Sequence, residues 1–337
     1  MLLLLLACAG ASDPQPTDPV TDADADTDTD ADADSDTDTD ADTNADPVAV
    51  DPLDLAELAS EAEIEATIRD LSAIPTRYTA TDGDEAARDY LLDRLDALGL
   101  DVTTSTFDAG DGTIATNIIG RQHGTADADV VYVFQAHYDS TSNQPDTLAP
   151  GADDNASGVA AVLEAARALE TYPLAYSAWF VFTAAEEQGS LGSAALVEQV
   201  DREGVDVRGV LAPDMMAYWP LRDEDGFDIL GDDDSEDLVN QMADIADQLG
   251  VAHKVWVMHD YCYGDDHTNW QEAGYPAISP MDCVEAHNLG RSSGETTPNY
   301  HRTTDTIDTL YLPFTREVVR VTNATFATWV VPLPPPQ

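Results

Sequence analysis

Basic residues are scarce in this chain. Its 337 residues include only 14 lysines and arginines against 66 aspartates and glutamates, which gives a formal net charge of −52 at pH 7. Lys254 is the single lysine. A surface with this excess of negative charge repels the phosphate backbone, so the composition argues against nucleic acid as a partner.

Long apolar runs are absent too. The first residues, Met-Leu-Leu-Leu-Leu-Leu-Ala-Cys, form a run that is too short to cross a bilayer. Their Leu-Leu-Ala-Cys ending resembles the box that directs lipid attachment in bacterial lipoproteins, here at Cys8. The alternative is an ordinary cleaved signal peptide. Ala9 stands where an aspartate would retain a lipoprotein at the inner membrane. We therefore expect an exported protein that is held at the outer membrane or cell surface only by its lipid, or that is secreted.

Cysteine is rare, with three in the whole chain. If Cys8 carries lipid, Cys262 and Cys283 remain. Two leftover cysteines in an exported protein favour a disulfide. Both cysteines flank candidate site residues, so the bridge would brace the wall of that site. Two buried thiols are the alternative.

Residues 13–46 lack both basic and large apolar side chains apart from one valine. They repeat Asp with Thr and Ala and include fourteen aspartates, so the rest of the chain keeps a net charge of −38. Such a segment cannot bury enough surface to offset its ordering entropy. No glycine-containing calcium loop is present, which favours a solvated spacer over a calcium site. We expect a signal over residues 1–8, a disordered stalk over 9–51 and one folded domain over 52–337.

Strand-like and helix-like segments alternate along the folded domain. Short apolar runs predict strands at residues 117–120, 130–134, 178–183, 207–211 and 254–258. Periodic apolar residues predict helices around residues 64–71, 87–98 (with Gly99 as a stop), 159–169, 191–200, 237–249 and 314–330. This order predicts an α/β fold, in which helices cover both faces of a mostly parallel sheet and ligands bind beyond the carboxyl ends of the strands.

Histidines and carboxylates follow the predicted strands. They stand in five segments, at His137 and Asp139, at Asp153 and Asp154, at Glu186 and Glu187, at Asp214, and at His301. Imidazole nitrogen and carboxylate oxygen are zinc ligands, and a catalytic zinc keeps a position open for water. Two histidines and three carboxylates can hold two zinc ions if one carboxylate bridges them, which leaves a further carboxylate free to act as a base.

In order and spacing these segments resemble the co-catalytic two-zinc aminopeptidases, a family that includes secreted bacterial leucine-type aminopeptidases, glutaminyl cyclases and glutamate carboxypeptidases. The resemblance covers roughly residues 55–310. It implies the zinc-exopeptidase fold, a three-layer sandwich around a mixed, mostly parallel sheet. It also implies two zinc ions, with ligands His137, Asp154, Glu187, Asp214 and His301. Asp153 and Asp154 could exchange roles, but counting back from Ser157-Gly158 favours Asp154 as the bridge.

The resemblance also assigns the catalytic roles. Glu186 matches the general base. It takes a proton from a zinc-bound water, which becomes the bridging hydroxide, and passes the proton to the leaving amine. Asp139 matches a carboxylate that orients the imidazole of His137. Tyr300 matches an oxyanion donor of some members, whereas others have an aliphatic residue there. The family further implies a cis peptide bond between Asp154 and Asn155.

Other residues could shape a pocket. Met215, Tyr218 and Met281 are candidates for the side-chain pocket, although Met215 and Met281 fit a plain core equally well. We interpret His267 as structural or as part of the pocket wall. The remaining histidines have no partner motif and are interpreted as surface or loop residues, namely His123, His253, His259 and His287.

The predicted activity is hydrolysis of the N-terminal peptide bond of peptides with a free N-terminus, with a preference for apolar residues, by a monomer. A glutaminyl cyclase of the same family is the first alternative. A carboxypeptidase is the second, for which Arg302 and Arg291 could bind the substrate carboxylate. A non-catalytic binding module on a stalk is the third, and the presence of all five ligands and Glu186 argues against it.

Overall fold

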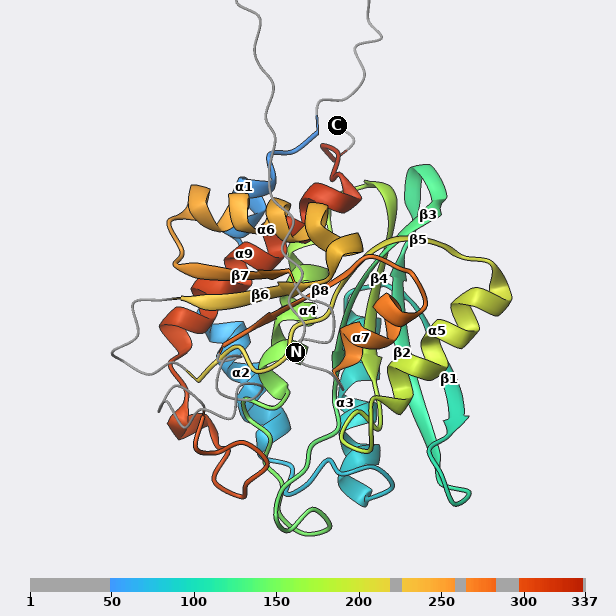
Figure 1. Cartoon of the computed structure of the whole chain (residues 1–337), viewed down its shortest axis with the longest axis vertical. Coiled ribbons are helices and arrows are strands. Elements are labelled where there is room, and N and C mark those ends of the chain that lie inside the picture. Colours follow the sequence, from blue (N-terminus) through green and yellow to red (C-terminus); the bar gives the residue numbers. More distant parts are fainter. Residues whose placement is uncertain (1–48, 219–225, 258–264, 283–296, 336–337) are drawn as a thin grey trace, which may run out of the picture. The chain divides into compact units, whose positions relative to one another are not determined.

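A computed structural model describes residues 49–218, 226–257, 265–282 and 297–335 (Figure 1). The chain divides into two units, Met1–Ala45 and Asp46–Gln337, and the described residues belong to the second. Cys8, Cys262, Cys283 and nearly all of the expected stalk lie outside the described residues, so the lipid, disulfide and stalk stay predictions. None of the helices in the described part combines the length and apolarity needed to cross a membrane.

Eight strands form one mixed sheet. They lie in the order β1 (Asp101–Asp108), β2 (Ile114–Gln122), β4 (Leu174–Thr183), β3 (Gly124–His137), β5 (Asp206–Leu211), β8 (Ala277–Met281), β6 (Phe227–Gly231) and β7 (His253–Val257). The four central strands β4, β3, β5 and β8 are parallel. β1 and β2 add antiparallel pairs at one edge, and β6 runs antiparallel to β8 near the other.

Helices cover both faces of this sheet, as Figure 1 shows. The larger layer holds α1 (Pro52–Ala56), α2 (Glu61–Ser72), α3 (Asp82–Ala97), α4 (Ala156–Leu169), α6 (Glu236–Leu249) and α9 (Leu312–Val330). The smaller layer holds α5 (Leu191–Glu203) and α7 (Asp266–Glu272). Successive side chains of a strand point to opposite faces. In β4, Phe180 and Phe182 therefore join the larger core, and Trp179 and Val181 join the smaller. The predicted three-layer α/β fold is confirmed.

The helices begin and end where the sequence signals them. Ser60 accepts a hydrogen bond from the Glu63 amide at the start of α2, and Asn155 accepts one from the Gly158 amide at the start of α4. Gly99, at φ +69°, takes the left-handed conformation that follows α3. The predicted helices and strands are all present with shifted ends.

Within the residues that the structure describes, the sequence patterns missed three strands and two helices. β1 reads DVTTSTFD and is largely exposed at the sheet edge, so it lacks an apolar run. β6 and β8 have only five residues each, and Pro280 interrupts the pattern of β8. Neither α1 (five residues) nor α7 (seven residues) is long enough to show a clear helical period.

Replacing Phe326 with alanine should destabilise the fold. The ring is fully buried in α9, with centroids 5.2 Å from Phe134 and 5.8 Å from Phe180. Phe326→Ala should lower the free energy of unfolding by about 3–5 kcal/mol, measured by chemical denaturation of the metal-free protein. The matched control is Ile114→Ala, since Ile114 is 61% exposed. A loss below about 1 kcal/mol for Phe326→Ala would contradict the packing described here.

Candidate metal centre

Parallel strands bring the candidate residues to one edge of the sheet. β3 ends at His137, which pairs in register with Thr183 at the end of β4, just before Glu186 and Glu187. β5 also runs parallel to β3 and ends shortly before Asp214. The carboxyl ends of parallel strands meet at the same edge, and this is where α/β folds place their ligands.

The loop before α4 carries the shared carboxylate to the same edge. Asn155 donates a hydrogen bond from its side-chain amide to the Pro213 carbonyl oxygen at 3.0 Å, which joins this loop to the segment that carries Asp214. Gly158 allows the close approach, because a Cβ there would lie 2.7 Å from the same carbonyl oxygen. The peptide bond between Asp154 and Asn155 is cis, which confirms the expectation.

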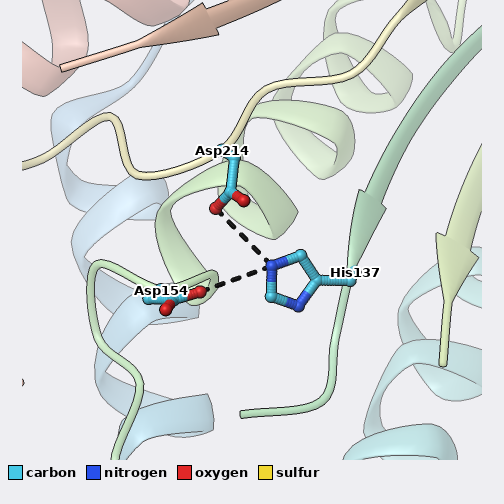
Figure 2. A group of neighbouring side chains, drawn as sticks. All are labelled: His137, Asp154 and Asp214. Atoms are coloured by element: carbon cyan, nitrogen blue, oxygen red, sulfur yellow. Dashed lines mark ion pairs between the residues drawn. The ribbon is translucent and has the colours of Figure 1, made fainter. Parts of the chain in front are cut away.

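Two carboxylates converge on the ring of His137 (Figure 2). Its Nε2 lies 3.4 Å from Oδ1 of Asp154 and 3.5 Å from Oδ1 of Asp214. All three residues are buried. Figure 2 shows both carboxylates pointing at the same ring nitrogen, from the loop before α4 and the loop after β5.

A second group shares the same aspartate. Nε2 of His301 lies 3.4 Å from the other oxygen of Asp154, Oδ2, and 3.0 Å from Oε2 of Glu187. The side chain of His301 is 41% exposed and that of Glu187 only 1%, so the second group opens to solvent on the side of the histidine. Asp154 thus presents one oxygen to each histidine, which is the arrangement of a bridging ligand.

The donor set fits two metal ions. Within each group of three residues, one ligand atom per side chain lies within 4.8 Å of the others. Oδ1 of Asp214 and Oε1 of Glu187 are buried without a hydrogen-bond partner in the described part of the chain. Buried polar atoms are costly to leave unpaired, and a cation bound in each group would lie beside one of these two side chains. Nitrogen and carboxylate ligands suit zinc.

Without metal, protons occupy this site. Burial lowers the pKa of His137, but the charge of Asp214 and the hydrogen bonds to Asp139 and Asp154 raise it well above the usual value overall. For His301, burial is likewise outweighed by hydrogen bonds to Asp154 and Glu187, which raise the pKa to about 10. Burial and the charge of Asp154 raise the pKa of Glu187 to about 7.

Asp139 joins the first group to the glutamate pair. It is fully buried, and its Oδ1 lies 3.5 Å from Nδ1 of His137. Its two carboxylate oxygens accept hydrogen bonds from the backbone amides of Glu186 at 3.1 Å and Glu187 at 3.2 Å. One side chain therefore fixes both the ring of His137 and the backbone of the two glutamates.

Glu186 stands apart from both groups of ligands. Its Oε2 lies 4.0 Å from Nε2 of His137, and its Oε1 accepts a hydrogen bond from the Ser190 hydroxyl at 3.0 Å. Burial, together with the charge of Glu187, raises its pKa well above the usual value against the opposing effect of His137. A carboxylate beside the ligands with a raised pKa suits proton transfer near neutral pH.

Two functional side chains escaped the sequence reasoning. Asp305 accepts hydrogen bonds from the backbone amides of Asp153 at 3.0 Å and Asp154 at 3.1 Å, so it holds the loop of the shared carboxylate. Asp265 lies near Asp214, and burial followed by the charge of Asp214 raises its pKa well above the usual value. Asp305 lies close to His301 in the sequence and Asp265 close to His267, but no local pattern indicates which ligand each carboxylate supports.

The other predicted site residues differ in their exposure. Met215 and Met281 are buried, 3% and 2% exposed, in a small apolar cluster with Leu230. Tyr218 is half-buried. Tyr300 is 39% exposed, and its ring stacks on that of His301 at 3.7 Å between centroids.

His267 lies apart from both groups of metal ligands. It is buried in α7, and burial lowers its pKa to about 4, so it is neutral at pH 7. Its Nδ1 lies 3.7 Å from Oδ2 of Asp265. Of the histidines without a partner motif, His123 and His253 are exposed and half-buried, whereas His259 and His287 lie outside the described residues.

Comparison with known proteins identifies the family. A family model described as Peptidase family M28 matches residues 117–325, which is more than half of the chain. The chain belongs to Peptidase family M28. This confirms the resemblance seen in the motifs, and the matched segment of the M28 chain contains all five candidate ligands and Glu186.

Two relatives illustrate the similarity of the M28 chain to curated proteins. The chain is 27% identical over 274 residues to a "Probable zinc metalloprotease" of Pyrenophora tritici-repentis, covering 66% of this chain and 56% of that protein. It is 27% identical over 265 residues to "Leucine aminopeptidase 1" of Sclerotinia sclerotiorum, covering 72% of this chain and 67% of that protein. The M28 chain thus spans a little over half the length of the first relative.

Solved structures share the fold. The LapA aminopeptidase of Legionella pneumophila superposes with a TM-score of 0.69 at 20% identity, over 87% of this chain and 79% of that chain. A glutaminyl cyclase of Bacteroides thetaiotaomicron superposes with a TM-score of 0.63 at 21% identity, over 81% of this chain and 97% of that chain. Because both activities occur on this fold, the fold of the M28 chain does not choose between them.

Zinc binding should release protons and strengthen as the pH rises. His137 and His301 have raised pKa values in the metal-free protein, about 10 for His301, so both carry a proton at pH 7 that zinc must displace. Calorimetric titration with zinc at pH 7 in buffers of different ionisation enthalpy should show net proton release, and the affinity should rise from pH 6 to pH 8. An affinity that is constant over this range would contradict the protonated site.

Asp139→Asn should weaken metal binding. The amide group can accept a hydrogen bond only through its oxygen, so one backbone amide of the glutamate pair loses its partner and the contact with His137 changes. Zinc affinity should fall about 10- to 100-fold, measured by competition with a chromophoric chelator. Asp232→Asn is the matched control, because buried Asp232 also accepts a backbone hydrogen bond, from Ser235, outside the site. Equal affinities in the two variants would refute the role of Asp139.

Proposed function

We propose that the chain is a two-zinc aminopeptidase, which hydrolyses the N-terminal peptide bond of peptides with a free N-terminus and prefers apolar N-terminal residues. The observation that carries this proposal is the division of Asp154 between two ligand groups, one oxygen facing each histidine, with Glu186 left free beside them. The names of the fungal relatives, a zinc metalloprotease and a leucine aminopeptidase, support the same activity.

Each residue has a defined task in this proposal. His137 and Asp214 would hold one ion, Glu187 and His301 the other, and Asp154 both. When bound, the ions would supply an activated water between them and stabilise negative charge that develops on the scissile carbonyl oxygen. Glu186 takes a proton from the attacking water and passes it to the leaving amine nitrogen. Asp139 keeps the ring of His137 and the backbone of Glu186 in place during this transfer.

Buried carboxylates favour a substrate with a free amine. Burial and the charges of Asp214 and Glu186 raise the pKa of Asp265, so these three carboxylates lie near one another. An ammonium group placed among them would gain Coulomb energy, whereas an acetylated amine would not. The apolar preference is supported by the cluster of Met215, Met281 and Leu230 beside Asp214 and by the name of the leucine aminopeptidase relative.

Glutamine cyclisation is the second candidate, because a glutaminyl cyclase shares the fold. The names of the relatives, a zinc metalloprotease and a leucine aminopeptidase, favour the aminopeptidase over this candidate. A carboxypeptidase would need a basic group for the substrate carboxylate. Arg302 is exposed, and Arg291 lies outside the described residues.

Glu186→Gln should abolish turnover but keep the metals. Without the carboxylate, proton transfer is lost and kcat should fall by at least about 100- to 10,000-fold. The assay compares leucine-p-nitroanilide with its N-acetylated form, with and without a chelator, and measures bound zinc for each variant. Glu198→Gln is the control, because Glu198 is exposed in α5.

The outcomes separate the candidates. Cleavage of the free-amine compound alone, lost with the chelator and restored by zinc, supports the aminopeptidase. Cyclisation of N-terminal glutamine without cleavage would replace it with the cyclase. Two bound zincs with neither reaction, or full activity in Glu186→Gln, would reject the proposal.

We further propose that the chain is exported as a monomer and anchored by lipid at Cys8, at the outer membrane or cell surface. The Leu-Leu-Ala-Cys box and the acidic segment after it support this location. Fractionation of cells that express the wild type or Cys8→Ser should find the wild type with membranes and the variant released. A wild-type protein that is freely soluble would reject the anchor.

A further inference from the structure

Arg77 is a fully buried cation whose guanidinium donates to four backbone carbonyl groups. It is 0% exposed. Its Nε donates to the Tyr138 carbonyl oxygen at 2.8 Å, and its Nη1 to those of Leu71 at 3.1 Å and Pro150 at 2.6 Å. Its Nη2 donates to the Gly151 carbonyl oxygen at 2.9 Å. Within the described part of the chain, no carboxylate forms a direct ion pair with it.

Three of these four carbonyl groups belong to the segments that carry the metal ligands, and the fourth, that of Leu71, lies in α2. Tyr138 stands between His137 and Asp139, and Pro150 and Gly151 lead to Asp154. A second link runs beside the first, because the Arg77 amide donates to Oγ of Ser140 at 3.2 Å and this hydroxyl donates to the Ala149 carbonyl oxygen at 2.7 Å. Arg77 and Ser140 together therefore tie the end of β3 to the loop of the shared carboxylate.

The fit around the guanidinium is close. Gly151 has φ +53°, and a Cβ at this position would lie 2.8 Å from Nη2 of Arg77. Arg77 thus occupies space that only a glycine leaves open. A planar group with several fixed N–H donors can hold carbonyl groups of separate segments at once, which a lysine cannot do.

The carboxylates with the largest effect on Arg77 belong to the site. Burial lowers its pKa to about 10, so it keeps its charge at pH 7. The carboxylates that oppose this effect are Asp305, Asp139, Asp154 and Glu187, all of them in the site. Burying an unpaired cation is costly, and here the cation faces a group of carboxylates from behind the ligands.

We propose that Arg77 is a positioning residue for the metal pair: its guanidinium holds residues 138–140 against residues 149–151, and so sets His137 relative to the shared carboxylate of Asp154. This inference rests on the proposed two-zinc function. Arg77 itself touches neither substrate nor metal. Replacing Arg77 leaves every ligand present, but the distance between the two segments that supply the ligands is no longer fixed.

The test measures zinc binding in Arg77→Lys and Arg77→Met. Both variants lose the planar fork, so both should bind zinc about 10- to 100-fold more weakly in competition with a chromophoric chelator. The d–d absorption of the cobalt-substituted protein should change as well. Wild-type affinity and spectrum in Arg77→Lys would overturn the positioning role, since the charge alone would then suffice.

Gln122→Leu is the matched control. Gln122 also donates from its side chain to two backbone carbonyl groups, those of Leu169 at 3.2 Å and Tyr172 at 2.7 Å. Gln122 is the last residue of β2 and pairs with Ala178 of β4, whereas the site lies at the end of β4 after Thr183. This variant should keep wild-type zinc affinity even if it is less stable. An equal loss of zinc affinity in Gln122→Leu would mean that general destabilisation explains the result, and would overturn the role of Arg77.

Ser140→Ala keeps the test decisive if the Arg77 variants do not fold, as judged by circular dichroism. It removes the second link and leaves the guanidinium in place, so zinc affinity should fall by a smaller factor of about 3 to 10; unchanged affinity would overturn the proposal. The wild-type protein separates the two levels. If it binds fewer than two zincs, the proposed function fails. If it binds two and all the variants do so equally well, only the positioning role fails.

Discussion

The two oxygens of Asp154 face two histidines, and the rest of the site is arranged around this one carboxylate. His137 reaches it from the end of β3 and His301 from the segment before α9. Burial alone would raise the pKa of Asp154, but hydrogen bonds from both histidines hold it well below its usual value. It is therefore ionised when its neighbours are protonated, which keeps it ready to bind cations that replace those protons.

Holding Asp154 requires support from several parts of the chain. Asp305 accepts hydrogen bonds from its loop, Asn155 joins that loop to the segment of Asp214, and Arg77 binds the carbonyl groups at its start. None of these three is a predicted ligand. Ligands from separate loops gain their geometry from such contacts, because loops by themselves have many conformations.

This arrangement concentrates several carboxyl groups in a buried region. Asp153, Asp154 and Asp305 lie within one buried region, and burial together with this neighbourhood raises the pKa of Asp153 to about 8 and that of Asp305 to about 7. In the metal-free protein the site thus retains protons on carboxyl groups that are ordinarily ionised. Bound cations and the positive charge of Arg77 also offset the negative charge of these groups. This links metal binding to the stability of the surrounding loops.

The sequence by itself determined the fold class, the family and the residue types that could bind metal. Apolar runs alternating with helical periods specify a parallel sheet, and in such a sheet residues that follow strands must meet at one edge. That is why His137, Glu187 and Asp214 could be placed together from local patterns alone. β1 and β8 escaped detection, because one is an exposed edge strand and the other is short and contains Pro280.

Only the tertiary structure decided which side chains support the ligands. Asp265 lies near Asp214, Asp305 holds the backbone of Asp153 and Asp154, and Arg77 reaches carbonyl groups up to 74 residues away in the chain. Contacts of this kind join residues that are distant in sequence, and they depend on burial and on hydrogen bonds to backbone atoms, which every residue type provides. Local sequence patterns therefore do not predict these contacts, whereas the residue types of the ligands, histidine and carboxylate, indicate metal binding.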